Sequence, residues 1–483
     1  MASDRKIFER AMLVFVFASF VLTALAFAWK YFYWDFDDSF IVYRYVENII
    51  SGNGWRYNLS ESYNASTSVL NPLLIALPSF FAGDPRLVAH VLGGIWLLLS
   101  GVSLFLLMRR QYGDIYAAAS AVFIVFILGR NATWGIETNL FLSLCILFAL
   151  MESYGYNTWY LLGLIVLARP DGLVLLMAKT AVSSYMQRRL PWKGILQSLL
   201  VLLPWVLYSL FTFHQVFPET LKQKMMQARS GFWGEGNIYL GFLAGLARTW
   251  KTWLMATAVP AALGAVFMVR RRSPLLYLLF FALSVQAAYV VLNVPGYHWY
   301  ACSLTTVYNI CVLYGLGEAL LLAGKPLGRL LDERMPGNVP AIAGAAAAAG
   351  LLVFSVYTLK DMTGMPETDG RTEAYRLLSQ DINEKVGPGT LAALEVGAVG
   401  YYTRREILDL TGLTSSRGEF MTGRKNDIFF SLLPRVVLVH SSVSNKERKI
   451  IEDPRILEYY NLGGTVSSPA YQDMVYFVRK DGV

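Results

Sequence analysis

Trp34-Asp35-Phe36-Asp37-Asp38-Ser39-Phe40 directly follows the first long apolar run of the chain, Ala11 to Phe32. Three carboxylates therefore fall within four residues, at the point where the chain is expected to leave a lipid bilayer. Carboxylates at that depth are costly to desolvate, so their presence there indicates a function. The stretch predicts a membrane-spanning fold that begins before it and a polar site that begins with it.

The composition of the whole chain also indicates a membrane protein. Of its 483 residues, 55% are hydrophobic and only 16% are charged, whereas soluble domains carry about 25% charged residues. Apolar runs such as Leu87 to Met108 and Thr252 to Val269 approach the ~20 residues that a helix needs to cross a bilayer. The first run is longer than the apolar part of a signal peptide and no small-x-small cleavage site follows it, so we expect a retained helix.

The net charge of +8 indicates membrane topology rather than nucleic-acid binding. Its basic clusters stand in short links between apolar runs, as the positive-inside rule predicts for cytoplasmic links. On this basis we expect about eleven transmembrane helices, a cytoplasmic N-terminus, contact with membrane lipids and no nucleic-acid partner. The clusters are Arg5/Lys6/Arg10, Arg109/Arg110, Arg188/Arg189/Lys193, Arg270/Arg271/Arg272 and Lys325/Arg329/Arg334.

Two of the expected helices, about 158–168 and 171–186, meet at Arg169-Pro170-Asp171-Gly172. A single span over 158–178 would bury Arg169 and Asp171 at mid-depth and place the following basic link outside. We therefore predict two short helices joined by a polar turn below the outer surface. Charge at that depth is tolerated only where it lines a water-filled cavity or the protein interior, so the turn indicates a site.

The composition changes after Lys360, where a last, Gly/Ala-rich helix at about 339–357 has ended. Residues 361–483 carry short β-branched runs at 390–394, 406–410, 435–439 and 474–478, with a helical pattern from Glu373 to Lys385. We predict a transmembrane domain over 1–360 and an α/β domain over 361–483. Counting of spans places this domain outside the membrane, on the same side as the outer loop 34–85.

The acidic pair Asp37-Asp38 opens an amphipathic stretch from Ser39 to Ile50, in which Phe40, Ile41, Val46 and Ile49 are able to face the membrane. One carboxylate is able to cap this helix, but a cap leaves the other carboxylates unexplained. The alternatives are a general base that deprotonates an acceptor hydroxyl, or a carboxylate that stabilises positive charge on a reacting carbon. The sequence leaves the assignment open between the two residues, with Asp38 favoured as the base and Asp37 as its partner or the cap.

The run that follows carries a family resemblance. Tyr45-x-x-Asn48-x-x-x-Gly52-x-Gly54-x-x-Tyr57-Asn58, Ser66-Thr67-Ser68 and Asn71-Pro72-Leu73 resemble the first outer loop of GT-C glycosyltransferases. The most similar branch is that of bacterial arabinofuranosyltransferases, which includes mycobacterial terminal arabinofuranosyltransferases and pilin arabinosyltransferases of Gram-negative bacteria.

Further segments resemble this branch in the same order along the chain. They are Gly135-Ile136-Glu137-Thr138, Arg169-Pro170-Asp171-Gly172, Pro218-Glu219-Thr220 with Lys222 and Lys224, Leu394-Glu395-Val396-Gly397-Ala398-Val399-Gly400-Tyr401-Tyr402, and Asp409-Leu410-Thr411-Gly412-Leu413. The chain departs from the branch at Glu219, where Asn is usual, and at His298-Trp299-Tyr300, where a His-Arg-Phe-like step is expected.

The resemblance implies a GT-C fold in a bacterial inner membrane, with a periplasmic C-terminal domain. It implies transfer of D-arabinofuranose from a polyprenyl-phosphoryl donor to a hydroxyl group of a glycan or pilin acceptor. Asp37 and Asp38 are then the catalytic carboxylates. A divalent cation on the phosphate stays possible, although no complete set of metal ligands is visible.

The resemblance also assigns candidate binding residues. Because the leaving group is a phosphate, cations should lie near it, and the candidates are Lys222, Lys224, Arg169 and His298. The alternatives are a solvated or lipid-contacting face for the lysines, an ion pair with Asp171 or Glu137 for Arg169, and a structural hydrogen bond for His298. Candidates for the sugar or the acceptor are Glu137, Trp34, Trp134, Tyr45, Asn58 and Trp299.

Other interpretations of these candidates and of the whole chain remain. Glu137 is equally able to pair with Arg130, and the tryptophans are able to form an aromatic belt at the membrane surface. Another transferase of lipid-linked aminoarabinose, mannose or glucose, a transporter or flippase, and a non-catalytic scaffold are the rival functions. A transporter is expected to show inverted repeats, and the sequence shows no repeat.

Overall fold

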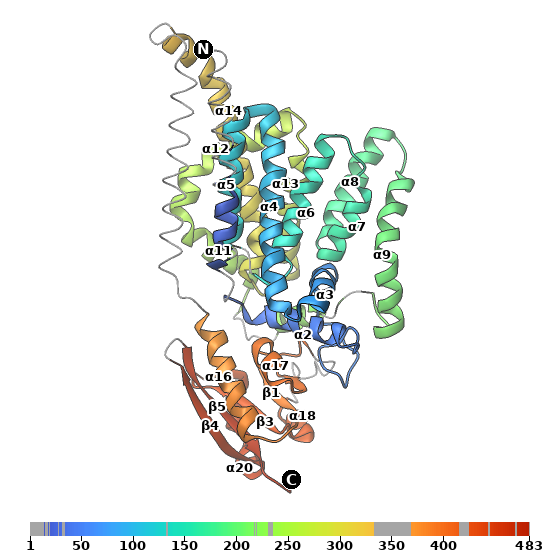
Figure 1. Ribbon diagram of the computed structural model, residues 1–483, viewed down its shortest axis with the longest axis vertical. Helices are drawn as coiled ribbons and strands as arrows, with labels where there is room; N and C mark the ends of the chain where they lie inside the picture. Colours follow the sequence, from blue (N-terminus) through green and yellow to red (C-terminus); the bar gives the residue numbers. More distant parts are fainter. Residues whose placement is uncertain are drawn as a thin grey trace.

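The structure is a computed structural model that describes residues 34–131, 134–216, 218, 220–229, 235–332, 369–414, 425–442, 445–468 and 471–482, together with 14, 18, 20–27 and 29–30. A helical bundle stands at one end and a small sheet domain at the other, with α2 and α3 between them (Figure 1). The predicted helix at about 339–357, the predicted boundary at 360/361 and Glu219 lie outside the described residues.

The bundle contains helices that are long enough and apolar enough to cross a membrane. Six such helices occur among the described residues, and in α14 the apolar part is His298–Ala323. The protein is therefore a multi-pass membrane protein, while the predicted count of about eleven helices stays a prediction. The six are α4 (Pro85–Tyr112), α5 (Asp114–Asn131), α9 (Trp192–Phe213), α12 (Lys251–Arg270), α13 (Leu275–Leu292) and α14 (His298–Asp332).

Three shorter helices, α6 (Thr138–Ser153), α7 (Trp159–Ala168) and α8 (Gly172–Gln187), stand beside the long ones in the bundle (Figure 1). Between α7 and α8 the chain turns at Arg169 to Asp171, as the sequence predicts. Pro170 cannot donate a backbone hydrogen bond, so α7 ends before it. After α9 the chain forms α10 (Thr220–Arg229) and then α11 (Ile238–Thr249).

The outer loop 34–85 forms two helices, α2 (Asp37–Ile50) and α3 (Leu70–Ala82). The expectation that the apolar face of α2 contacts the membrane is wrong, because Phe40, Ile41 and Val46 are buried inside the protein. The Phe40 ring lies 5.3 Å from the rings of both Tyr401 and Tyr402, which belong to the C-terminal domain. Protein, rather than lipid, covers this helix.

The C-terminal domain is built on a five-stranded mixed sheet with the strand order β2-β1-β3-β5-β4. Strand β1 pairs in parallel with β2 and β3, and β5 pairs antiparallel with β3 and β4. The parallel strands are buried along their whole length, as predicted by their sequences, which are apolar except for Asp409 at the end of β2 and His440 at the end of β3. The strands are β1 (Leu391–Ala393), β2 (Ile407–Asp409), β3 (Val436–His440), β4 (Tyr460–Ser468) and β5 (Tyr471–Arg479).

Short helices surround this sheet and connect its strands. They are α16 (Gly370–Lys385), α17 (Gly397–Thr403), α18 (Lys425–Leu432), α19 (Asn445–Ile451) and α20 (Arg455–Tyr459). One continuous hydrophobic core includes Tyr43 of α2, Leu128 of the bundle and Ala398 of α17. The sheet domain and the bundle therefore share a core, and α2 lies at the seam between them.

Candidate active site

Asp37 joins the two domains. It stands at the start of α2, and its carboxylate accepts hydrogen bonds from the backbone N–H groups of Gly397 (3.0 Å) and Ala398 (2.8 Å) at the start of α17. The first N–H groups of a helix have no partner within the helix and favour a carboxylate. A Cβ atom on Gly397 would stand 1.8 Å from the Asp37 carbonyl oxygen, so this close approach requires glycine.

Arg44 and Tyr57 continue the contact between the domains. The buried guanidinium of Arg44 donates to the carbonyl oxygens of Tyr57 (2.8 Å), Gly400 (2.9 Å) and Arg405 (2.7 Å). The Tyr57 hydroxyl donates to the Val396 carbonyl (2.6 Å). These buried contacts satisfy backbone carbonyls of the C-terminal domain and hold it in one orientation.

Asn58 and Tyr45, two candidates for contacting the sugar or acceptor, also have structural partners. The Asn58 amide donates to the Ile407 carbonyl and accepts from the Ile407 N–H, both at 2.9 Å. The Tyr45 hydroxyl donates to the Tyr63 carbonyl and accepts from the Ala65 N–H, both at 2.9 Å. Both side chains are buried, and neither lines the cavity described next.

A cavity of about 370 Å³ lies between the two domains. Asp37, Asp38 and Lys224 line it from the membrane domain, and Arg371 and Glu395 line it from the C-terminal domain. Its volume falls within the range of about 300–1,000 Å³ that is usual for small-molecule sites. The acidic corner predicted from the sequence is thus one wall of a cavity that contains charged side chains from both domains.

Asp38 differs from its neighbours in having a free carboxylate. Among the described residues, none forms a hydrogen bond or ion pair with it. Burial raises the pKa of Asp38, and the positive charges of Lys224 and Arg371 offset part of this effect. Burial and the nearby Glu395 carboxylate raise the pKa of Asp37 to about 7, but its two oxygens are already engaged by α17.

The third carboxylate of the corner, Asp35, is fully buried and structural. It accepts hydrogen bonds from the Tyr43 hydroxyl (2.6 Å), from Arg86 and from His90 Nε2 (2.7 Å). Burial alone raises the pKa of Asp35, but His90 and Arg86 more than offset this, and the net pKa is lowered. Asp35 therefore fastens the start of α2 to α4.

Lys224, on α10, faces Asp38 and an aromatic wall. Its ammonium contacts the Tyr300 hydroxyl and lies 4.8 Å from the centre of the Tyr300 ring. Burial lowers the pKa of Lys224, while the Asp38 carboxylate opposes this. Lys224 is thus a partly desolvated cation beside the free carboxylate.

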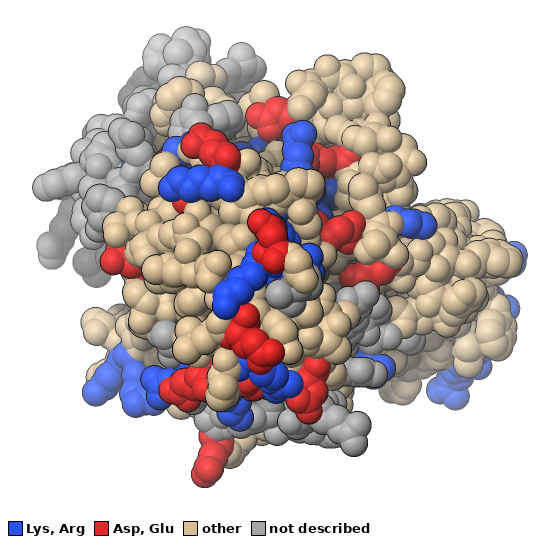
Figure 2. Space-filling view, turned by 90° about the horizontal axis from the view of Figure 1, so that it is seen from below, with Lys and Arg blue, Asp and Glu red and all other residues tan. Residues whose placement is uncertain are grey.

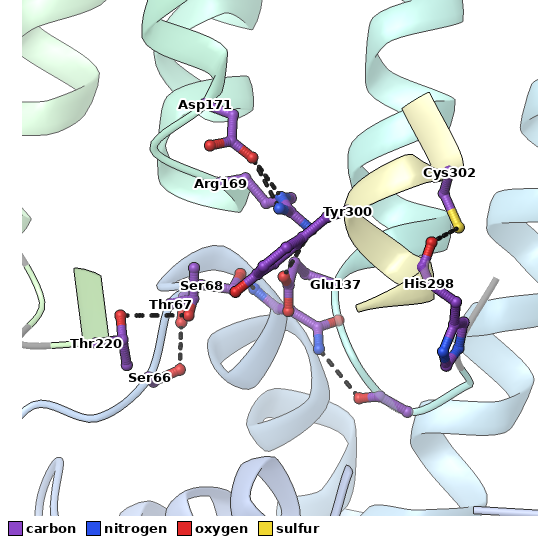
Figure 3. A network of polar contacts seen from close by, with 12 residues as sticks. Ser66, Thr67, Ser68, Glu137, Arg169, Asp171, Thr220, His298, Tyr300 and Cys302 are labelled. Atoms are coloured by element: carbon purple, nitrogen blue, oxygen red, sulfur yellow. Dashed lines mark hydrogen bonds and ion pairs between the residues drawn. The ribbon is translucent and has the colours of Figure 1, made fainter. Parts of the chain in front are cut away.

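Arg169 lies beside Tyr300 (Figure 3), with its guanidinium 5.7 Å from the centre of the Tyr300 ring. Its guanidinium donates to Asp171 Oδ2 at 3.0 and 2.7 Å and to the Tyr289 hydroxyl at 3.2 Å, and it pairs with Glu137 at 3.4 Å. The ion-pair alternative for Arg169 and Glu137 therefore describes their geometry. The polar turn from Arg169 to Asp171 thus lies in the protein interior, where Arg169 packs against the Tyr300 ring.

The Ser66-Thr67-Ser68 loop meets α10 next to this network. The Thr67 hydroxyl donates to the Thr220 hydroxyl at 3.5 Å (Figure 3). An apolar groove of about 160 Å³ begins at this loop and is lined by side chains of α7, α8 and α9, including Leu167, Leu173 and Trp205. Helix α10 connects the groove to the cavity, because its Thr220 contacts Thr67, which lines the groove, and its Lys224 lines the cavity.

The remaining candidates lie outside the cavity. Lys222 and His298 are exposed, and Trp34 is half-buried. Trp134 is buried and stacks on His90, with ring centres 5.8 Å apart. Trp299 is buried, and its ring centre lies 4.7 Å from that of Tyr297 in a stacked arrangement; through Tyr297, which lines the cavity, it supports the wall.

Several cavity residues have no signal in the sequence. Arg371 and His440 belong to no motif, and Glu395 lies within a quoted motif without an assigned role. The buried Asp409 carboxylate accepts hydrogen bonds from the loop N–H groups of Thr411 (2.7 Å), Leu413 (2.8 Å) and Thr414 (2.8 Å), which shape the loop that completes the wall. Within the described ranges, no group of three or more His, Cys, Asp or Glu side chains is placed to hold a metal ion.

Comparison with known proteins identifies the type of fold. No family model matches the chain. Half of it (272 residues) is 27% identical to the terminal beta-(1->2)-arabinofuranosyltransferase of Mycobacterium tuberculosis and spans 42% of that protein. The structure of ArnT from Cupriavidus metallidurans bound to undecaprenyl phosphate matches with a TM-score of 0.57 at 14% identity, over 99% of this chain and 98% of that one.

The oligosaccharyltransferase of Archaeoglobus fulgidus matches with a TM-score of 0.52 at 12% identity, over 93% of this chain and 72% of that one. ArnT and this oligosaccharyltransferase are GT-C proteins, so the chain has the GT-C fold with a C-terminal sheet domain. The resemblance drawn from the motifs is confirmed, including its similarity to a mycobacterial terminal arabinofuranosyltransferase.

Proposed function

We propose that this protein is a glycosyltransferase that moves D-arabinofuranose from a polyprenyl-phosphate donor to a hydroxyl group of a glycan or pilin acceptor. The reaction takes place on the periplasmic side of a bacterial inner membrane, with the N-terminus in the cytoplasm. The observation that carries the proposal is the cavity in which the free carboxylate of Asp38 faces the buried cation Lys224.

Asp38 is the proposed general base. As the acceptor oxygen forms a bond to the anomeric carbon, the bond from that carbon to the phosphate oxygen breaks, and the acceptor proton passes to Asp38. A general base works best when its pKa lies near the working pH, and burial moves the pKa of Asp38 in that direction. Asp37 has a different task, since it holds the C-terminal wall in place.

Lys224 is the proposed contact for the departing phosphate. A cation in a site of low dielectric stabilises the developing phosphate charge strongly. Arg169 supports this arrangement through the wall formed by Glu137, Asp171 and Tyr300, whereas Lys222 and His298 stay predictions. The apolar groove between α7, α8 and α9 offers a path for the prenyl chain, which favours a lipid-linked donor.

The test is transfer by the purified protein from radiolabelled polyprenyl-phosphoryl arabinofuranose. We expect Asp38→Asn to lower turnover by at least about 100-fold, because removing a general base costs about 10²–10⁴-fold, with donor binding retained. Asp37→Asn is the matched control: it should lower thermal stability, because one N–H of α17 loses its acceptor, and it should retain measurable turnover.

Unchanged turnover in Asp38→Asn would remove the catalytic role of this corner. Transfer from donors that carry aminoarabinose, mannose or glucose on the same lipid, in place of arabinofuranose, would support one of the rival transferases. No turnover by the wild-type protein with any of these donors would favour the transporter or flippase interpretation.

A further inference from the structure

A chain of hydrogen bonds connects residues of the C-terminal wall of the cavity, where Glu395, His440 and Glu447 line it, through the buried Tyr375. Glu447 Oε1 lies 2.6 Å from His440 Nδ1, and His440 Nε2 lies 2.7 Å from the Tyr375 hydroxyl. The Tyr375 hydroxyl donates to Glu395 Oε2 at 2.9 Å. The four residues come from α19, the end of β3, α16 and the connection between β1 and α17, so the chain requires the whole domain to be folded.

This chain ends at an ion pair that faces the cavity. Arg371 donates to Glu395 Oε1 at 3.2 Å, and its guanidinium lies 4.5 Å from the centre of the Phe36 ring. Tyr375 is 0% exposed and Glu447 1%, whereas the side chains of Glu395 and Arg371 are 33% and 20% exposed. The buried members thus support a pair that is open to a ligand.

The ion pair has unused hydrogen-bonding capacity. Arg371 Nη2 is shielded from solvent and has no hydrogen-bond partner within the described part of the chain. The carboxylate of Glu395 is able to accept further hydrogen bonds beyond the two that it receives. A shielded donor such as Arg371 Nη2 is costly to leave without a hydrogen bond. Because Arg371 can donate and Glu395 can accept, a ligand with hydroxyl groups, which both donate and accept, fits this pair.

The proton positions follow from counting donors. Tyr375 gives its single proton to Glu395, so its oxygen accepts a hydrogen bond from His440 Nε2, and that nitrogen carries a proton. The other ring nitrogen faces a carboxylate, which only accepts, so it also carries a proton. With Glu395 and Glu447 ionised, this arrangement of donors favours an imidazolium ion at His440, between Glu447 on one side and, through Tyr375, Glu395 on the other.

The surroundings of His440 support its positive charge. Burial lowers the pKa of His440, and the positive charge of Arg371 also lowers it. The carboxylates of Glu447 and Glu395 raise it by more, so the net pKa of His440 is raised. The Tyr471 ring of β5 covers the remaining side, with its centre 6.3 Å from that of His440. All the residues named in this cluster belong to the C-terminal domain.

We propose that Arg371 and Glu395 form the acceptor subsite, in which they bind neighbouring hydroxyl groups of a glycan, and that Tyr375, His440 and Glu447 are positioning residues that hold Glu395 in place. The assignment rests on the proposed function. It places the acceptor on the C-terminal side of the cavity, opposite the phosphate contact Lys224. The rings of Phe36, Tyr297 and Tyr471 line the same cavity and offer apolar faces to a sugar ring, which favours a glycan over a peptide.

The first test compares Tyr375→Phe with Tyr476→Phe, each of which removes one buried hydroxyl from the C-terminal domain. Tyr476 is the matched control because its hydroxyl donates to Asp381, at 2.6 Å, away from the cavity. The probes are polyprenyl-phosphoryl arabinofuranose as donor and the octyl glycoside of an arabinofuranosyl disaccharide as acceptor. We expect Tyr375→Phe to raise the KM for the acceptor by about tenfold, the effect of one lost hydrogen bond to a charged group, with the donor KM and the Tyr476→Phe variant unchanged.

Equal kinetics for the two variants would overturn the positioning role. A rise of both KM values in Tyr375→Phe would overturn the acceptor subsite, since donor and acceptor then share these residues. Transfer to a Ser/Thr-containing peptide but not to the octyl glycoside would replace the glycan by a protein acceptor. Absence of transfer by the wild-type protein with every lipid-linked sugar would overturn the proposed function and the acceptor subsite together.

The second test does not depend on transfer. The chain has four histidines, so the ring signals of isotope-labelled histidine can be resolved by NMR in detergent and assigned with His440→Gln. We expect His440 to titrate above the usual value of about 6.5, and Glu447→Gln to lower its pKa. A His440 that titrates at or below this usual value would overturn the charge chain even if transfer is observed.

Discussion

Asp37 and Asp38 are neighbours in sequence, but their carboxylates meet different environments. The Asp37 side chain points to the start of α17, where two N–H groups hold it. The Asp38 side chain, one residue further along the same helix, points into the cavity toward Lys224. Successive helical residues face directions about 100° apart. One carboxylate of the pair therefore binds the C-terminal domain while the other faces the cavity.

At the same scale, the state of His440 predicts a pH dependence. Its folded pKa is raised, so its hold on Tyr375 is complete at low pH and is lost as the pH rises through the folded value. We expect the KM for the acceptor to rise on the alkaline side of about pH 6.5, the usual value for histidine, while the donor KM stays constant. Steady-state kinetics across this range test the prediction, and His440→Gln should show a high acceptor KM without this rise. A rise that persists in His440→Gln would assign it to another group.

Single residues of the site were predictable where a motif or a charge in an apolar setting marked them. Asp38, Lys224 and the Arg169 turn were found in this way. The sequence did not predict Arg371, Tyr375 and His440. Each is an ordinary residue type for a mixed α/β domain, and its role depends on contacts with residues of other elements. Asn58 and Tyr57 were noticed as part of a motif, but their contacts with Ile407 and Val396 could not be derived from sequence alone.

At the scale of elements, the placement of charges predicted the break between α7 and α8, and short β-branched runs predicted most strands of the C-terminal domain. Helix α3 was missed, because 13 apolar residues are too few for a membrane span and were counted as part of the outer loop. Strand β4 was missed because Gly463 and Gly464 interrupt its β-branched pattern; the structure accommodates them with a register shift between Leu462 and Gly464.

The glycines of α17 lead to a prediction about this element. In Gly397→Ala the new methyl group meets the backbone of α2, so α17 must move away from Asp37. We expect a loss of stability of about 1–3 kcal/mol, which is usual for overpacking in a core, and a loss of transfer. Thermal unfolding and limited proteolysis in detergent measure the effect.

Gly387→Ala is the control for this substitution, because a Cβ atom there meets nothing within 4 Å. It lies in the same domain and carries the same change in backbone entropy. Equal stability of the two variants would show that the approach of α17 to α2 is not tight.

At the scale of the whole molecule, the two-part layout of a helical bundle and a sheet domain followed from the change of composition along the chain. The cavity did not, because it forms between segments that are distant in sequence, and no periodic pattern reports such a contact. The face of the C-terminal domain opposite the bundle carries acidic and basic side chains side by side (Figure 2). That mixed surface suits a domain that extends into solvent.

Membrane orientation supplies the prediction at this scale. The native cysteines are buried, so single introduced cysteines report the accessible side. We expect Glu452→Cys, in the C-terminal domain, to react with a membrane-impermeant maleimide in intact spheroplasts, and Arg189→Cys, between α8 and α9, to react only after lysis. Labelling of Arg189→Cys in intact spheroplasts would reverse the topology and place the proposed site in the cytoplasm.

The link between α2 and α17 has a consequence for how the protein is made. Arg44 finds its carbonyl partner on Gly400, 356 residues later, and Asp37 finds its N–H partners equally late. The acidic corner therefore leaves the ribosome early and stays open to water while the bundle inserts. Since a chain folds from its N-terminal end during synthesis, the cavity forms only when the C-terminal domain has been synthesised and has packed against α2. A nascent or truncated chain therefore carries Asp38 without the cavity around it.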